Sequence, residues 1–303
     1  MYLIINFTLH TMNIKNIIIA LFVTTTVLLT IACNSKPKQD NGTTSKKEKS
    51  TLTKPANPLI VADKLDSAGS PVDNGKKKVY LTFDDGPNVG TRQVIDILKA
   101  TNIPATFYMI GLHRYGSPVQ VNLWKEVNTY PQFEVTNHSF THAYRNNFGK
   151  FYSDVDGAVN DFVRNQDSLK FNNTIIRAPG SNVWRLQGTR IDHLFKQRTK
   201  VMDSLYALGY YITGWDAEWN YNGRTQKAIQ TPDMLIAEMN GLFATPKLLN
   251  KPNHLILLAH DMVYHDSTDA AWLKEFIVKL KADPKVEFRV ISQYPGAEKA
   301  FAH

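Results

Sequence analysis

Short apolar segments alternate with amphipathic segments from Val79 onward. The apolar segments are rich in β-branched and aromatic residues, which predicts strands at residues 79–83, 105–110, 133–136, 174–176, 210–213, 255–259 and 286–291. Apolar residues at helical spacing predict helices near residues 91–100, 155–169 and 269–282, and Thr231-Pro232 is typical of a helix N-cap followed by proline. Strands that alternate with helices predict an α/β fold with a covered parallel sheet.

Seven strand–helix units in about 225 residues suit an incomplete barrel of the βα type. An open, doubly wound parallel sheet is the alternative. Both architectures bring catalytic and binding residues to the carboxyl ends of the strands. The residues that follow each predicted strand are therefore the candidates for a functional site.

The segment before Val79 has a different pattern. A short positive region at residues 13–16 precedes an apolar run at residues 17–32, and Cys33, the only cysteine, follows directly. This layout predicts a signal peptide over residues 1–33, with Met12 as an alternative start to Met1. It resembles a bacterial lipoprotein signal, which implies lipidation of Cys33, a membrane anchor through that lipid and an extracytoplasmic location. An uncleaved anchor is one alternative, although 16 residues fall short of the roughly 20 that span a bilayer, and plain secretion is another.

Residues 34–77 are rich in lysine and small polar residues, which predicts a flexible basic tether ahead of a folded domain at residues 78–303. The net charge of the chain is +8, but residues 35–78 carry ten lysines against five acidic residues. Without that excess and Lys15, a net charge of about +2 remains. A nearly neutral domain does not favour nucleic-acid binding.

Ionisable or aromatic residues follow five of the seven predicted strands. They are Asp84 and Asp85 after the first strand, His138 and His142 after the third, Arg177 after the fourth, Trp215, Asp216, Glu218 and Trp219 after the fifth, and His260 after the sixth. The strand starts carry no comparable cluster. We therefore expect these side chains to share one cavity at the carboxyl edge of the sheet.

His138 and His142 are four residues apart, so on a helix both imidazoles would lie on one face and share a cation. A carboxylate from Asp84 or Asp85 is the natural third ligand of a site that keeps an open position. Adjacent side chains of a regular strand point to opposite faces. A turn at Gly86-Pro87 would let both carboxylates enter one pocket, one as a ligand and the other as a free base.

The motifs TFDDGP, HSFTH, RAPG, WDAEW and LLAHD occur in this order. Together they resemble the polysaccharide deacetylases with a NodB-type domain, carbohydrate esterase family 4, over roughly residues 78–291. The resemblance implies a distorted (β/α) barrel, here with about seven parallel strands. It also implies one divalent metal ion, usually zinc, with cobalt, nickel, iron or manganese as alternatives. Its ligands would be Asp85, His138 and His142.

The same resemblance implies roles for the remaining polar residues. Asp84 would be the general base, Arg177 would orient it, and His260 would be the general acid. The fourth motif usually holds a carboxylate that pairs with the acid histidine. Asp216 and Glu218 both remain candidates for that pair, and Asp216 is favoured.

The third motif departs from the usual R-x-P-Y-G, because Gly180 follows Pro179 directly and the tyrosine is missing. We expect the backbone at Gly180 to bind the substrate and help stabilise the oxyanion. Trp219 is expected either to line the pocket and stack on a sugar or to lie in the core.

These expectations combine into a metal-dependent hydrolase that removes acetyl groups from N-acetylated, or O-acetylated, sugars of a polysaccharide or oligosaccharide. Its other partner would be a membrane, reached through the N-terminal lipid, with no nucleic acid and no obligate protein partner. A carbohydrate-binding lipoprotein without turnover on the same fold is the alternative. A different metallohydrolase, such as a phosphoesterase, is disfavoured because a three-ligand site lacks the carboxylate bridge of a two-metal mechanism.

Overall fold

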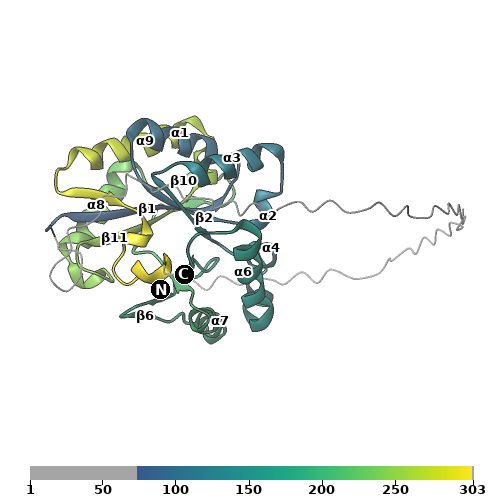
Figure 1. The fold of residues 1–303 in the computed structure, drawn as a ribbon. Coiled ribbons are helices and arrows are strands. Elements are labelled where there is room, and N and C mark those ends of the chain that lie inside the picture. The colour runs from purple at the N-terminus through teal and green to yellow at the C-terminus, as the bar shows by residue number, and fades with distance from the viewer. Residues whose placement is uncertain (1–73, 302–303) are drawn as a thin grey trace, which may run out of the picture. The chain divides into compact units, whose positions relative to one another are not determined.

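The computed structural model describes residues 74–301, and its main feature is one large, curled, mostly parallel sheet (Figure 1). The strands are β1 (Lys77–Gly86), β2 (Ala105–Met109), β3 (Phe133–Asn137), β4 (Ile175–Ile176), β5 (Trp184–Leu186), β6 (Thr189–Ile191), β7 (Tyr211–Ile212), β8 (Ala217–Glu218), β11 (His254–His260) and β12 (Val286–Arg289), with β9 (Tyr221–Asn222) and β10 (Lys227–Ala228) forming a separate hairpin.

The strand order is β6-β5-β7-β4-β3-β2-β1-β11-β8, and β12 pairs with the first residues of β1. Within the described residues this path does not close, so the sheet is a half-barrel. Every neighbouring pair in it is parallel except those made by β5. The predicted α/β fold with a distorted barrel is confirmed, and the seven predicted strands correspond to β1, β2, β3, β4, β7, β11 and β12.

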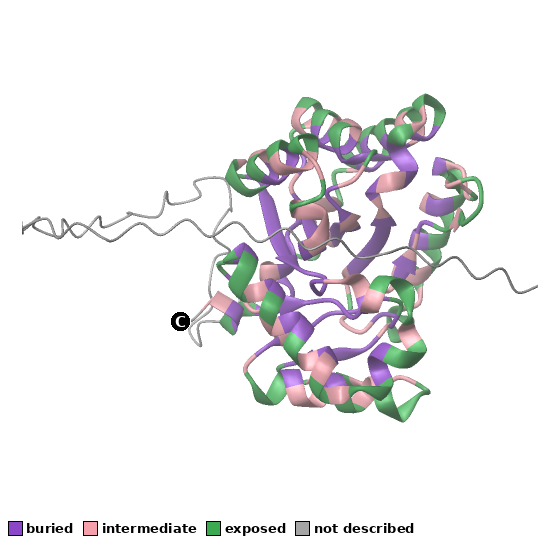
Figure 2. Cartoon of the chain, turned by 90° about the vertical axis from the view of Figure 1, so that its right-hand side faces the viewer, coloured by how far each residue is buried: buried purple, intermediate pink, exposed green. Residues whose placement is uncertain are grey.

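Helices follow most of the strands. They are α1 (Thr91–Thr101), α2 (Gly111–Arg114), α3 (Pro118–Thr129), α4 (His142–Asn146), α5 (Phe148–Ser153), α6 (Val155–Leu169), α7 (Lys196–Ala207), α8 (Pro232–Ala244) and α9 (Ser267–Ala282). Thr231 caps α8 by accepting a hydrogen bond from the Met234 amide, as its sequence predicts. Figure 2 shows buried strands between helices whose outer faces are exposed.

The alternation of side chains along β1 separates two layers of the core. Val79, Leu81 and Phe83 pack with the cluster that includes Leu98 of α1 and Phe276 of α9. Tyr80 points the other way, into a second cluster. The period of two therefore continues through Thr82 to Asp84, which lie on the inner face of the half-barrel.

The predicted signal peptide, Cys33 and residues 34–73 of the predicted tether lie outside the described residues. Within the described part of the chain, β1 begins at Lys77, close to the predicted domain start at residue 78. No helix between residues 74 and 301 is long and apolar enough to cross a membrane.

The backbone at Gly90, which directly precedes α1, lies against the loop after β11. A Cβ atom at Gly90 would lie 1.8 Å from the carbonyl oxygen of Asp261. We therefore expect Gly90→Ala to lower the free energy of unfolding by about 1–3 kcal/mol through overpacking. Urea denaturation of the purified protein measures this change.

Gly149→Ala is the matched control, because a Cβ atom at Gly149 would meet nothing within 4 Å. Gly149 lies inside α5, so alanine is expected to leave stability unchanged or raise it by up to about 1 kcal/mol. Equal denaturation midpoints for Gly90→Ala and the wild type would show that the two segments do not pack as described.

Candidate active site

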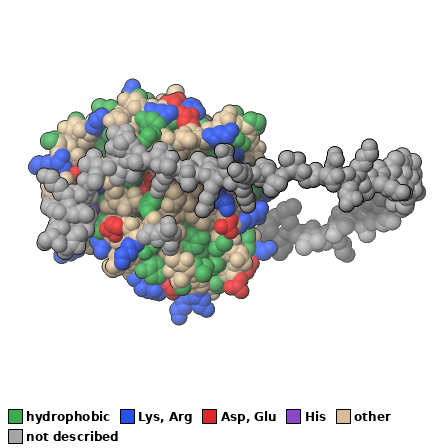
Figure 3. All heavy atoms as spheres, in the orientation of Figure 1, with side chains coloured by type: hydrophobic (Ala, Val, Ile, Leu, Met, Phe, Trp, Pro, Cys, Tyr) green, Lys and Arg blue, Asp and Glu red, His purple; other side chains and the backbone are tan. Residues whose placement is uncertain are grey.

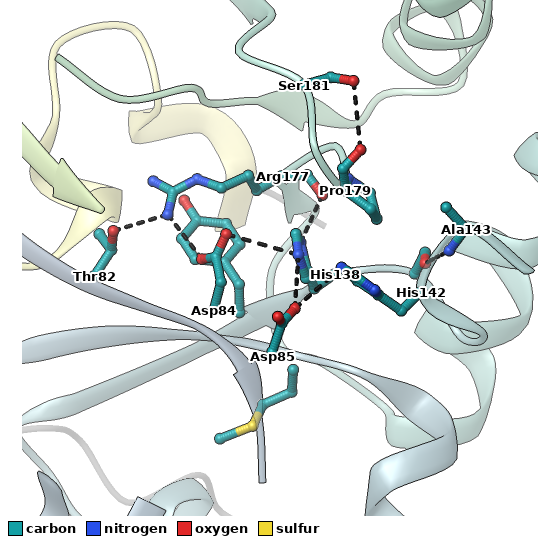
Figure 4. Close-up of polar contacts among 12 residues, drawn as sticks. Thr82, Asp84, Asp85, His138, His142, Ala143, Arg177, Pro179 and Ser181 are labelled. Atoms are coloured by element: carbon teal, nitrogen blue, oxygen red, sulfur yellow. Dashed lines mark hydrogen bonds and ion pairs between the residues drawn. The ribbon is translucent and has the colours of Figure 1, made fainter. Parts of the chain in front are cut away.

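The carboxyl ends of β1, β3, β4 and β11 meet at one cavity of about 1040 Å³. Its lining includes the predicted residues Asp84, Asp85, His138, His142, Gly180, Glu218 and His260. Arg177 lies beneath the cavity and contacts Asp84 (Figure 4). The structure thus brings together side chains that are up to 176 positions apart in the sequence.

A bulge in β1 explains how the adjacent carboxylates of Asp84 and Asp85 reach the same cavity. The register between β1 and β2 shifts between Asp84 and Gly86, and Asp85 has a φ of 73°. This left-handed backbone turns the Asp85 side chain away from the opposite face, where a regular strand would place it. The strand continues to Gly86, so the predicted turn at Gly86-Pro87 is replaced by a bulge one residue earlier.

Asp85, His138 and His142 form a cluster whose candidate ligand atoms all lie within 4.8 Å of one another. The Oδ1 atom of Asp85 is 3.4 Å from Nε2 of His138 and 3.1 Å from Nε2 of His142. Burial alone raises the pKa of Asp85, but the two imidazoles beside it hold that pKa well below its usual value. Asp85 is therefore an anionic candidate ligand at neutral pH.

Each histidine has its other ring nitrogen occupied by an acceptor. Nδ1 of His138 donates to the carbonyl oxygen of Arg177 at 3.0 Å, and Nδ1 of His142 donates to Oδ1 of Asn146 at 2.5 Å. These contacts leave both Nε2 atoms as the metal-facing nitrogens, an arrangement typical of histidine ligands. Oδ1 of Asp85 is also buried without a hydrogen-bond partner, so the donor set fits one divalent ion such as zinc.

The two histidines do not lie on one α-helix, which corrects the helical interpretation of their spacing. His138 directly follows β3, whereas His142 opens α4, in which residues 142 to 146 have φ values between 51° and 69°. This is a left-handed turn. It brings the two rings to a centroid distance of 5.1 Å.

Helix α6 supports the loop that carries both histidines. Oδ2 of Asp161 accepts hydrogen bonds from the backbone amides of Phe140 and Thr141, each at 3.0 Å. Asn165, which is fully buried, donates to Oδ1 of Asn137 at 2.8 Å. Asp161 and Asn165 are the signal that sequence reasoning missed, because they are polar residues on the core-facing side of an amphipathic helix.

Asp84 is held by a buried arginine. Nη1 of Arg177 donates to Oδ1 of Asp84 and to Oγ1 of Thr82, both at 2.8 Å, and Nη2 donates to the carbonyl oxygen of Gly214. The guanidinium also lies 4.0 Å from the centroid of the Tyr108 ring. Oδ2 of Asp84 is not bound by Arg177 and lies 3.6 Å from Nε2 of His138. This oxygen therefore lies beside the cluster of Asp85, His138 and His142.

His260 lies on the same rung of the sheet as Asp84, since the two residues are partners in the parallel ladder of β1 and β11. Its ring packs against that of Tyr221 at a centroid distance of 4.9 Å, and Nδ1 is buried without a hydrogen-bond partner in the described structure. Both candidate proton-transfer groups therefore line one cavity from neighbouring strands.

The favoured pair between Asp216 and His260 is not formed. The carboxylate of Asp216 instead accepts hydrogen bonds from the Ile256 amide and from the backbone and side chain of Asn250. The register pairs Glu218 with Leu258, which places Asp216 about 13 Å below His260 along β11 at roughly 3.3 Å per residue. Burial raises the pKa of Asp216 to about 6.

Glu218 is the carboxylate on the side of His260. It lines the cavity, and burial raises its pKa even though the charge of His260 acts in the opposite direction. The structure also separates the two tryptophans of this segment. Trp219 is 2 % exposed and packs against Tyr264 and Phe276 in the core, so its substrate-binding role is wrong, while Trp215 lines the cavity.

Gly180 lies at the cavity with a φ of 58°, next to Phe148. Other lining residues come from loops, short helices and the β9–β10 hairpin: Leu112, His113, Thr141, Arg145, Asn146, Phe148, Tyr221 and Gln226. Among them, Nδ1 of His113 donates to the carbonyl oxygen of Asp85 at 2.8 Å and thereby supports the bulge.

Comparison with known proteins gives the same family as the motifs. Residues 72–184 match the family model for polysaccharide deacetylase. The chain is 42% identical over 69 residues to a chitooligosaccharide deacetylase of Sinorhizobium fredii, which covers 22% of this chain and 30% of that protein. It is 30% identical over 161 residues to a peptidoglycan-N-acetylglucosamine deacetylase of Bacillus cereus, covering 49% of this chain and 50% of that protein. The chain therefore spans a third to a half of these curated relatives.

The fold also resembles the catalytic domain of a peptidoglycan N-acetylglucosamine deacetylase from Eubacterium rectale, with a TM-score of 0.55 and 23% identity. That match covers 79% of this chain and 97% of the other. The matched family segment contains the metal cluster together with Asp84 and Arg177, and the structural match extends the likeness to the curled sheet as a whole. The chain therefore carries a segment, residues 72–184, that matches the polysaccharide deacetylase family model, on a fold that resembles a solved deacetylase catalytic domain.

Proposed function

We propose that this protein is a metal-dependent deacetylase acting on an acetylated polysaccharide or oligosaccharide. One observation carries the proposal: a cluster of one carboxylate and two imidazoles lies beside a second carboxylate that an arginine holds in place. A binding protein has no need of this second carboxylate. The named relatives include enzymes for chitooligosaccharides and for peptidoglycan, which supports an N-acetylated sugar as the substrate.

The residues of the chain divide the reaction between them. A divalent ion, for which zinc is proposed, would supply a Lewis acid for the acetyl carbonyl and acidify water at the Asp85, His138 and His142 cluster. Asp84 accepts the proton of the attacking water on Oδ2, because Oδ1 is bound by Arg177.

The second proton transfer is assigned to His260 on β11, the strand next to β1. His260 donates a proton to the leaving nitrogen, or to the leaving oxygen of an O-acetyl ester, as the bond to the acetyl group breaks. Glu218 lines the same cavity and is proposed to assist His260 through its negative charge. The backbone at Gly180 is proposed to contact the acetyl group, and Trp215 and Tyr221 form the adjoining aromatic wall.

The proposed location is the extracytoplasmic side of a membrane, with Cys33 as a lipid anchor. The support is the sequence pattern at residues 13–33.

A carbohydrate polymer also suits the surface of the domain. On the face seen in Figure 3, lysine and arginine side chains lie among acidic and apolar ones instead of forming one continuous basic patch.

Asp84→Asn and His138→Ala test the proposed base and a proposed metal ligand separately. Asparagine cannot accept the proton, so we expect deacetylation to fall by about 10²–10⁴-fold while the metal remains bound. His138→Ala removes a ligand and is expected to lower metal affinity by more than about 100-fold, beyond the loss typical of outer-sphere partners. Acetate release from acetylated chitooligosaccharide and metal content after dialysis are the two measurements.

The reverse pattern would contradict these roles, namely an Asp84→Asn variant that loses metal but deacetylates normally. Metal-loaded protein that binds acetylated glycans but releases acetate from none of them would instead identify a binding protein on this fold.

Glu218→Gln and Asp216→Asn test which carboxylate assists His260. We expect Glu218→Gln to lower the rate about tenfold, less than the loss of an acid group. Asp216→Asn is expected to keep a rate close to that of the wild type, since Asp216 binds Asn250 and Ile256 instead. Loss of activity in Asp216→Asn alone would reverse the assignment.

Asp216→Asn also has an expected signature in stability. The native pKa of Asp216 is about 6 against a usual value of 3.8, so the native state holds this proton more tightly than the unfolded state. This group therefore destabilises the fold as the pH rises from about 4 to about 6. Urea denaturation of both proteins across this range should show a smaller decline for Asp216→Asn.

A further inference from the structure

One wall of the cavity carries a positive charge that the proposed chemistry does not use. The α4 wall consists of Thr141, Arg145, Asn146 and Phe148. Arg145 is exposed, and within the described residues its side chain forms no hydrogen bond and no ion pair. It follows His142 by three positions in the left-handed turn, where its own φ is 58°. The backbone of Arg145 is thus held close to the metal cluster.

Two acidic residues near Arg145 in the chain, Asp154 and Asp161, are bound elsewhere. Asp154 accepts hydrogen bonds from the Tyr144 hydroxyl and the Gly157 amide. Asp161 is buried and accepts the two backbone amides of the histidine loop. The charge of Arg145 is therefore not neutralised by these neighbours.

A second arginine adds to the positive potential on this side. The guanidinium of Arg198 lies 6.0 Å from the centroid of the Phe148 ring, and its Nη1 donates to the carbonyl oxygen of Gly180 at 2.5 Å and to Oγ of Ser181 at 2.7 Å. These acceptors are neutral. In contrast, Arg177 at the floor of the cavity is paired with Asp84. Arg145 and Arg198 therefore both place positive charge on the side bounded by Phe148 and Gly180.

We propose that Arg145 is a specificity residue that binds a carboxylate substituent on the glycan, on a sugar ring next to the acetyl group that is removed. The planar guanidinium matches a carboxylate through two parallel hydrogen bonds, and an exposed guanidinium at the cavity wall has its donors available. The substrate class is then an acidic acetylated glycan, such as one with lactyl ether or uronic acid carboxylates. This inference rests on the proposed deacetylase function.

The test compares two forms of one substrate with the full-length, metal-loaded protein. The first form is a peptide-free glycan of alternating N-acetylglucosamine and N-acetylmuramic acid, whose lactyl groups carry carboxylates. The second form is the same glycan after methyl esterification of those carboxylates. We expect the wild type to show a kcat/KM about fivefold higher for the acidic form, as for a partly exposed charge pair of good geometry.

Three variants decide whether Arg145 is responsible. In Arg145→Gln the ratio of the two kcat/KM values is expected to fall to about one, and in Arg145→Glu below one, because the introduced charge repels the carboxylate. Lys150→Gln is the matched control. Lys150 is an exposed cation on α5 that does not line the cavity, so its removal is expected to leave the ratio unchanged.

A wild-type ratio near one, or an Arg145→Gln ratio equal to that of the wild type, would overturn the assignment of Arg145 while leaving the deacetylase function intact. A fall of the ratio in Lys150→Gln as large as in Arg145→Gln would overturn it also, because it would indicate a diffuse surface potential. Absence of acetate release from both forms by the wild type would refute the proposed function, and the Arg145 subsite with it.

Discussion

The bulge at Asp85 is the constraint on which the rest of the site depends. In a regular strand Asp84 would face the interior of the half-barrel and Asp85 would face the helices, where a carboxylate has no partner. The positive φ of Asp85 and the shifted register turn its side chain toward His138 and His142. One strand end thereby supplies two carboxylates to one cavity, of which one is proposed to bind a metal ion and the other to accept a proton.

Burial of so many polar groups is costly unless each is satisfied. Arg177 is fully buried, and its ion pair with Asp84 is weak evidence for stability, since desolvation offsets the attraction. The ion pair instead fixes the position of the Asp84 carboxylate. The guanidinium joins Thr82 and Asp84 of β1 to the Gly214 carbonyl after β7, so it links these two strand ends to that of β4, which Arg177 follows. Asp161 does the same for the backbone of the histidine loop.

Periodicity placed the main strands and therefore the strand ends, which is why Asp84, Asp85, His138, Arg177 and His260 converge as expected. It did not decide between Asp216 and Glu218. That choice depends on the register of β8, a strand of two residues, and a strand so short carries no alternation of its own. The structure places Trp215 at the cavity and Trp219 in the core, a choice that the sequence left open for Trp219. The left-handed turn that orients His142 and Arg145 has no hydrophobic pattern to reveal it.

The division between sheet and loops separates the chemistry from the choice of substrate. Asp84 and His260 are partners on one rung, so backbone hydrogen bonds between β1 and β11 set the spacing of the proposed base and the proposed acid. The wall residues Arg145, Gly180 and Tyr221 come instead from a short turn, a loop and a small hairpin. Such segments tolerate change without disturbing the sheet. A carboxylate-binding arginine on the α4 wall can therefore alter which glycan enters while the proton-transfer pair keeps its geometry.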